Sequence, residues 1–299
     1  METVSDEPVD ICASALSAIV SHSSPPAQLI SELASHKDGF ATGWLVLHFI
    51  KQMEAGAPLR DLDLSKFSLD AGKLGVLLSS LPAGPDFLET LKGGPHVCTG
   101  PCLFALKRFL QRAASSSPPA SLKNLNIAKC DLSDSGGGSE LHSLPPSLEY
   151  LELNENRLGS HSMEALTSAF SEGTLSKLLG LDVSNNPLSP SGVATLARGL
   201  SASERALHLQ SLKLSKTAAK AEGVKALSVP LKEGKAPSLQ VLDLRGNDMR
   251  AEGVGGLAGA VGAGTLSSLR VLILKNNCVA ERSRDGRWDI SGLTALFSH

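Results

Sequence analysis

The chain has 299 residues with 28 basic and 30 acidic side chains, so its net charge of −2 predicts no general attraction to nucleic acid or anionic membranes. Aromatic residues make up 4% of the chain and include a single tyrosine, which is a poor basis for stacking on bases. Five irregularly spaced cysteines do not make a disulfide framework, and we expect an intracellular, cytoplasmic protein.

The first 55 residues differ in pattern from the rest of the chain. Residues 9–20 and 43–53 have helical patterns and flank a Ser/Pro-rich stretch at 22–26. The acidic start lacks the basic and apolar regions of a signal peptide, and the best apolar run, 43–50, is too short to span a bilayer. We expect residues 1–55 to form a helical cap on the repeats that follow, including a degenerate repeat through Ile30 and Phe40.

Residues 56–299 carry a repeated leucine pattern, L-x-x-L-x-L-x-x-N-x-L. Its clearest copies begin at Leu148, Leu178, Leu209, Leu239 and Leu269, with start-to-start spacings of 30, 31, 30 and 30 residues. Weaker copies begin at Leu59, Leu88 and Leu122, which gives about eight repeats. A constant period of this length predicts a solenoid rather than a globular enzyme core.

Each repeat divides into a strand half and a helix half. Residues 239–244, Leu-Gln-Val-Leu-Asp-Leu, alternate apolar and polar side chains as a half-buried strand does. Gly192, Leu196 and Leu200 have the four-residue spacing of one helix face. One repeat cannot bury that face alone, so neighbouring coils must stack to form a continuous core.

The asparagine position of the pattern has a separate structural role. The chain turns off the strand there, and a side-chain amide can satisfy the backbone groups that the turn leaves in the interior. Phe67 and His96 cannot do this, so irregular coils are expected around them. The predicted ladder consists of Cys130, Asn156, Asn186, Thr217, Asn247 and Asn277.

These motifs resemble the ribonuclease-inhibitor-like leucine-rich repeats, whose long units carry a helix after the strand. The resemblance covers roughly residues 30–299 and is most specific from 148 to 279. It implies an α/β fold, a leucine-rich-repeat solenoid shaped as a horseshoe, with parallel strands on the concave face and helices on the convex face.

The C-terminal repeat is interrupted by an insertion at residues 281–290. The insertion carries Trp288 and three arginines between 282 and 287, a basic loop that is either solvated or binds an acidic partner. Gly292 and Leu296 resume the helix pattern, but the next leucine in register would fall at position 300, so the last helix is truncated. Either Trp288 and Phe297 close the array or the chain is part of a longer one, and we favour closure.

No pattern in the sequence indicates catalysis, a metal or a cofactor. His96, Cys98 and Cys102 lack the second ligand pair of a structural zinc site. The glycines between 253 and 264 lack the lysine of a phosphate loop and lie in a predicted helix. The eight histidines form no triad, and we therefore expect a protein that is not an enzyme.

The concave face is the predicted binding surface, because alternate strand residues point out of the sheet there. Tyr150 and Arg245 are the expected centres of binding energy, since interfaces concentrate energy on such residues. The full set of candidate partner-binding residues is Tyr150, Glu152, Asp182, Lys213, Asp243, Arg245 and Lys275.

We expect a monomeric, non-catalytic scaffold that binds a protein partner, and neither nucleic acid nor membrane. Two alternatives stay open. The first is a GTPase-activating protein of the Ran-activator type, which shares such repeats but here lacks a long acidic tail and a clear arginine in the early loops. The second is the ligand-sensing repeat region of an immune-receptor-like protein.

Overall fold

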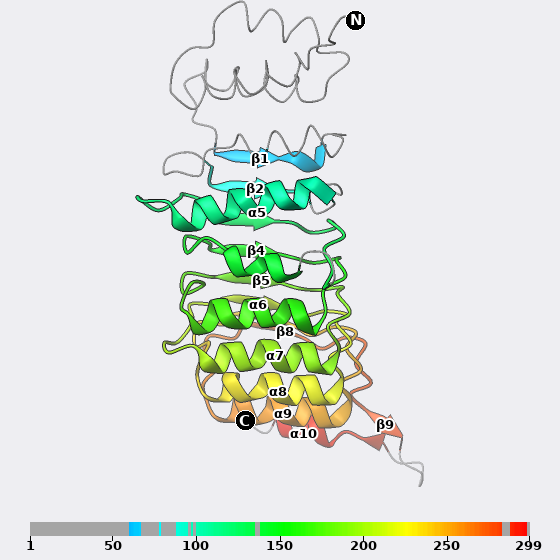
Figure 1. The fold of residues 1–299 in the computed structure, drawn as a ribbon. Helices are drawn as coiled ribbons and strands as arrows, with labels where there is room; N and C mark the ends of the chain where they lie inside the picture. Colours follow the sequence, from blue (N-terminus) through cyan, green and yellow to red (C-terminus); the bar gives the residue numbers. More distant parts are fainter. Residues whose placement is uncertain are drawn as a thin grey trace, which may run out of the picture. The chain divides into compact units, whose positions relative to one another are not determined.

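The computed structural model describes residues 60–66, 78, 88–94, 97, 100–134, 138–282 and 288–297 (Figure 1). The predicted cap at residues 1–55 lies outside the described residues, as do Phe67, His96 and Cys98 and most of the arginine loop. The domain boundary at residue 55 therefore stays a prediction.

The fold is α/β, and in the described part of the chain eight short strands run parallel in chain order and alternate with helices. This confirms the fold class predicted from the repeat pattern. Contacts divide the chain into two units, Met1–Asn124 and Leu125–His299. Unit 1 contains β1 (Asp61–Asp63), the 3-10 helix η1 (Leu64–Lys66), β2 (Thr90–Lys92) and α5 (Gly100–Ser115), and β3 (Asn124–Asn126) contains the boundary.

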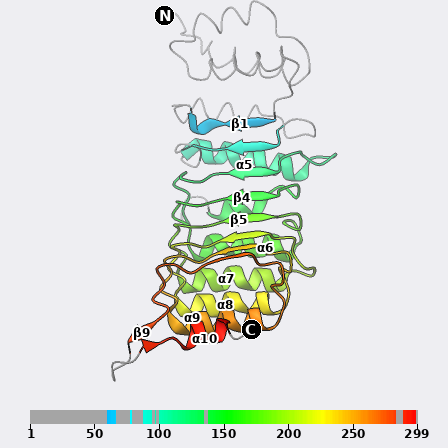
Figure 2. The same ribbon diagram turned by 180° about the vertical axis from the view of Figure 1, so that it is seen from behind.

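Unit 2 contains the regular repeats. Figure 1 shows its helices stacked one beside the next, and Figure 2 shows the strands on the opposite face. Its elements are η2 (Gly138–Ser143), β4 (Tyr150–Glu152), α6 (Ser160–Ser171), β5 (Gly180–Asp182), α7 (Ser189–Ala202), β6 (Ser211–Lys213), α8 (Lys220–Lys232), β7 (Val241–Asp243), α9 (Arg250–Gly262), β8 (Val271–Ile273), β9 (Glu281–Arg282), β10 (Trp288–Asp289) and α10 (Ser291–Phe297).

The middle leucine of each strand forms one interior column in unit 2. Parallel pairing aligns Leu151 with Leu181, Leu181 with Leu212, Leu212 with Leu242 and Leu242 with Leu272. The first four are at most 1% exposed, while Leu272, on the last strand of this sheet, is only half-buried. Burial of each leucine stabilises the fold by about 2 kcal/mol, and a strand shift by one residue would turn the whole column outward.

Small residues let the helices of unit 2 approach closely. A Cβ added at Gly199 of α7 would lie 2.7 Å from the Cα of Thr167 on α6, closer than real Cβ atoms approach backbone. The explanation does not extend to every helical glycine, because Gly255 and Gly259 of α9 have nothing within 4 Å of an added Cβ.

A column of buried amides runs beside the leucines. The Nδ2 atoms of Asn156, Asn186, Asn247 and Asn277 each donate to a carbonyl of their own coil and to one of the preceding coil, at 2.7–3.0 Å. Their Oδ1 atoms accept backbone N–H groups of the preceding coil. Each amide thus satisfies groups that would otherwise be buried without partners.

Thr217 occupies the same column, but among the described residues its side chain contacts the amide of one neighbouring coil only. Its hydroxyl donates to the carbonyl of Leu214, 3.0 Å away in its own coil, and lies 2.9 Å from Oδ1 of Asn247 in the following coil. Among the described residues, no hydrogen bond joins the Thr217 side chain to the coil of Asn186. The amide column is therefore interrupted between these two coils.

At the C-terminal insertion, β9 and β10 pair antiparallel. Gly292 and Leu296 of α10 are buried, as their spacing predicts. The expectation that Phe297 closes the array is wrong, because its side chain is 81% exposed. None of the helices in the described residues has the length and apolarity needed to cross a membrane.

Asp134 caps α6 from the preceding coil. The helix begins after Gly159, which has no capping side chain, and the Asp134 carboxylate accepts the N–H groups of Gly159, His161 and Ser162 at 2.8–3.1 Å. Burial raises the pKa of Asp134, but hydrogen bonds from the Ser162 hydroxyl and these N–H groups outweigh it and lower the pKa below 3.8. Negative charge at a helix N-terminus is also favoured by the helix dipole.

The interrupted amide column predicts a stabilising substitution. Thr217→Asn should raise the free energy of unfolding by about 1 kcal/mol, because the amide can donate to the coil of Asn186. Thr217→Val should lower it by a similar amount by removing both hydroxyl contacts. Urea unfolding measures both, and a destabilised Thr217→Asn protein would show that the preceding coil is out of reach.

The Asp134 cap predicts a pH-dependent contribution to stability. A lowered folded-state pKa means that the carboxylate stabilises fully above the unfolded value and loses this effect as pH falls through the folded one. Asp134→Ala should cost about 1 kcal/mol at pH 7, and the cost should shrink below pH 3.8. Urea unfolding of both proteins across pH 3 to 7 tests this, with Glu204→Ala as the control for an exposed carboxylate. A cost that is independent of pH would contradict the assigned role.

Candidate partner-binding surface

The outward side chains of β4–β8 and of the residues just after each strand form the surface that we call the strand face. Parallel pairing places equivalent residues in columns across the strands. The first column is Tyr150, Gly180, Ser211, Val241 and Val271. The second is Glu152, Asp182, Lys213, Asp243 and Ile273.

Tyr150 lies against the backbone of the next strand. Its side chain is 43% exposed, and a Cβ added at Gly180 would stand 2.7 Å from Cδ1 of the ring. Gly180 therefore leaves the space in which the ring rests. An aromatic side chain that is already ordered loses less entropy on binding, which favours Tyr150 as a contact residue.

The charges of the second column are partly paired across strands. The Lys213 ammonium lies 3.4 Å from the Asp182 carboxylate, and Glu152 accepts a hydrogen bond from Asn126. Asp182 also accepts the N–H of Ser184 at 2.9 Å, so this carboxylate holds the turn after β5. Exposed pairs of this kind contribute little stability and leave Lys213 available to a partner.

Asp243 is almost entirely removed from the surface. Its side chain is 4% exposed, accepts the backbone N–H of Arg245 at 3.1 Å, and binds the Arg245 guanidinium through Nε and Nη2, the latter at 2.6 Å. These hydrogen bonds, together with the charge of Asp243, raise the pKa of Arg245. We therefore assign Asp243 to positioning Arg245, whose side chain is 49% exposed.

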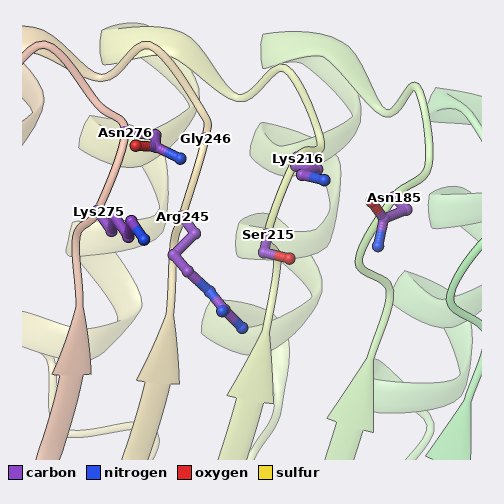
Figure 3. A pocket seen from close by; sticks show the side chains of 7 residues that line it. All are labelled: Asn185, Ser215, Lys216, Arg245, Gly246, Lys275 and Asn276. Atoms are coloured by element: carbon purple, nitrogen blue, oxygen red, sulfur yellow. The ribbon is translucent and has the colours of Figure 1, made fainter.

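The residues that follow the strands enclose a pocket of about 330 Å³. Lys216, Arg245 and Lys275 supply positive charge, and the three lie on neighbouring coils (Figure 3). The remaining lining residues are Asn185, Ser215, Gly246 and Asn276. Sequence reasoning identified Arg245 and Lys275 but missed Lys216.

Lys216 lies in a column with its own backbone signature. Asn185, Lys216, Gly246 and Asn276 all have φ between 53° and 65°, the left-handed conformation that begins each turn before the amide column. Each directly precedes a residue of the predicted ladder, and that position could have indicated this column in the sequence.

Apolar side chains lie on β7 and β8, the strands that lead to Arg245 and Lys275 of the pocket. Val271 is 43% exposed, and Val241 and Ile273 are partly exposed. Val271 and Ile273 precede Lys275 by four and two residues, so all three lie on the same face of the strand.

Other candidate sites have less support. In the described ranges, no group of three or more His, Cys, Asp or Glu side chains is placed to hold a metal ion. Cys102 and Cys130 are buried thiols, and Sγ of Cys130 lies 3.3 Å from the carbonyl oxygen of Ala128. A second pocket, beside α8 and α9, is lined by both acidic and basic side chains. Its Arg250 lies 3.6 Å from the carboxylate of Asp248.

Comparison with protein families finds a match to a model described as Leucine Rich repeat, over residues 235–258. This segment contains β7 and the first part of α9. A search among curated proteins finds no match. The match and the parallel strands alternating with helices fit a leucine-rich repeat protein.

The contact between Tyr150 and Gly180 predicts the effect of a single methyl group. Gly180→Ala should displace the ring, while stability changes by less than about 1 kcal/mol because the ring can turn toward solvent. Tyr150 is the only tyrosine, so NMR of ring-labelled protein reports on it alone. Ser211→Ala, on the next strand of the same column, is the control. Unchanged ring signals in Gly180→Ala would contradict the described packing.

Proposed function

We propose that this chain is a non-catalytic interaction protein that binds a protein partner on its strand face, as the concave face of a ribonuclease-inhibitor-like repeat array. The observation that carries the proposal is the ordered row of exposed groups from Tyr150 to Lys275 on a scaffold held by buried leucines and amides. Such a surface needs no rearrangement to present its side chains, which keeps the entropic cost of binding low.

The charge distribution on the strand face supports recognition of a particular partner orientation. Glu152 and Asp182 lie toward β4 and β5, whereas Lys213, Arg245 and Lys275 lie toward β6–β8. Negative and positive charges separated along one face favour a single docking direction of the partner and disfavour the reverse one.

We further propose that residues 1–55 form a helical cap, that residues 56–299 form the repeat domain, and that the protein is a cytoplasmic monomer. No observation on the described residues favours the Ran-activator or immune-receptor alternatives.

The proposal predicts that two substitutions on the strand face remove binding. Tyr150→Ala with Arg245→Ala should weaken capture of the natural partners at least tenfold, because losing hot-spot residues costs about 2 kcal/mol or more each. The matched control is Val229→Ala with Lys232→Ala, which removes an exposed apolar side chain and an exposed cation from α8 on the helix side.

Affinity purification with quantitative mass spectrometry compares the three proteins, and photo-crosslinking from position 213 or 229 locates the contact. Loss of partners in the strand-face variant, with crosslinks from position 213, is the expected result. Loss in the α8 variant, with crosslinks from position 229, would overturn the strand-face proposal.

A further inference from the structure

The pocket after β6–β8 has a composition that suits one kind of ligand. Its lining combines three cations with Asn185, Ser215 and Asn276, which are hydrogen-bonding side chains, and includes no acidic residue (Figure 3). A volume of about 330 Å³ accommodates a single carboxylate or phosphate group with its adjoining atoms. Charge and size together select a small anionic group.

The positive charge of the pocket is only partly compensated within the chain. Asp243 neutralises Arg245 and accepts hydrogen bonds from its Nε and Nη2, and Nη1 donates none to a described residue. Within the described part of the chain, neither Lys216 nor Lys275 forms an ion pair. Two exposed ammonium groups thus face the same space, and an anion between them relieves their repulsion.

The backbone keeps the pocket open. Gly246 has φ +65 and stands between Lys216 and Asn276 in the left-handed column, where the other members carry side chains. A Cβ at Gly246 would stand 3.1 Å from Cγ of Lys216. The missing side chain therefore leaves room for a ligand group beside the lysine.

The surroundings indicate what else the ligand carries. Val241, Val271 and Ile273 make the strand face apolar beside the pocket, so a bound segment places an apolar side chain there and its anionic group in the pocket. Arg245 has already committed two of its nitrogen atoms to Asp243, so it does not offer its full bidentate fork to a carboxylate or a phosphate. The Lys216 and Lys275 ammonium groups act as point charges on either anion.

We propose that this pocket binds the anionic side chain of an acidic, partly apolar peptide segment in the partner. The inference rests on the proposed function and names the chemistry of the partner at one end of the strand face. Aspartate or glutamate and a phosphorylated residue share the required anionic oxygen chemistry.

The test uses the full chain and defined peptides, so it does not depend on knowing the partner. The probe is a fluorescent peptide of alternating Glu and Leu, compared with the same peptide carrying Gln for Glu and with one carrying phosphoserine for Glu. Binding is followed by anisotropy and mapped by the amide NMR shifts of Lys216, Gly246 and Asn276. We expect saturable binding of the Glu peptide, weakened at least tenfold by the Gln replacements and decreasing with ionic strength.

Two variants and a control locate the effect. Lys216→Asn with Lys275→Gln removes the unpaired charges, and asparagine is chosen at 216 because it occupies the same left-handed column at 185 and 276. Gly246→Asn fills the pocket without changing its charge. Both should reduce affinity at least fivefold, whereas Lys177→Gln with Lys232→Gln, which removes the same charge from exposed positions elsewhere, should not.

The outcomes separate this inference from the proposed function. Preference for the phosphoserine peptide, with the same variant pattern, assigns the pocket to phosphorylated segments and supports the shared chemistry. Equal binding by the Gln peptide, an equal loss in the control variant, or tighter binding of a single-stranded oligonucleotide overturns the inference. If the pocket variants leave partner capture intact while Tyr150→Ala, which lies outside the pocket, removes it, the pocket assignment fails and the strand-face proposal stands.

Discussion

The buried amide column is the interaction on which the rest of unit 2 depends. Each coil turns inside the protein, where its backbone carbonyls and N–H groups have no water, and leaving one unpaired costs about 1–3 kcal/mol. Asn247 alone donates to Leu214 and Leu244 and accepts from Thr217 and Ala219. The Asn247 amide therefore closes its own turn and joins it to the preceding coil. This connection fixes the register in which neighbouring strands pair.

The strand face follows from that constraint. Because the amide column sets the register, residues at the same offset from it stand side by side on successive strands. Ser215, Arg245 and Lys275 each lie two residues before Thr217, Asn247 and Asn277. A pocket built from neighbouring coils is thus specified by the sequence of each coil separately. Backbone hydrogen bonds between the coils, such as the one from the Lys216 N–H to the Arg245 carbonyl at 2.7 Å, bring its cations together. Stacked coils with nearest-neighbour contacts are the general basis of such surfaces.

The sequence predicts the leucine column and the strand positions well, because a period of 30 residues permits only one register that buries every leucine. The period does not predict which residues have a positive φ or which local hydrogen bonds a side chain forms. The spacing marks Asp243 as outward-facing, yet its carboxylate turns back to the N–H of Arg245 and is buried. Lys216 joins the pocket because its backbone is left-handed. Phe297 is exposed, although its aromatic character had suggested a closing role.

The position of the pocket within unit 2 also bears on how binding and stability are connected. Lys275 lies in the coil of β8, where Leu272 and Leu274 are less buried than their equivalents in the preceding coil, Leu242 and Leu244. In a stack with nearest-neighbour contacts, a coil with less buried apolar surface opens more readily than the interior ones.

A ligand that contacts Lys216, Arg245 and Lys275 together bridges three coils and is bound only while the β8 coil is in place. Binding therefore stabilises this coil by mass action. The measured affinity is lowered by the free energy needed to keep the coil packed on its neighbour. Binding at the coils that carry Tyr150 and Gly180 does not include this free-energy cost, because their leucines are already buried. The two ends of the strand face thus differ in the burial of their leucines, and binding stabilises the coil at the β8 end more than the coils at the β4 end.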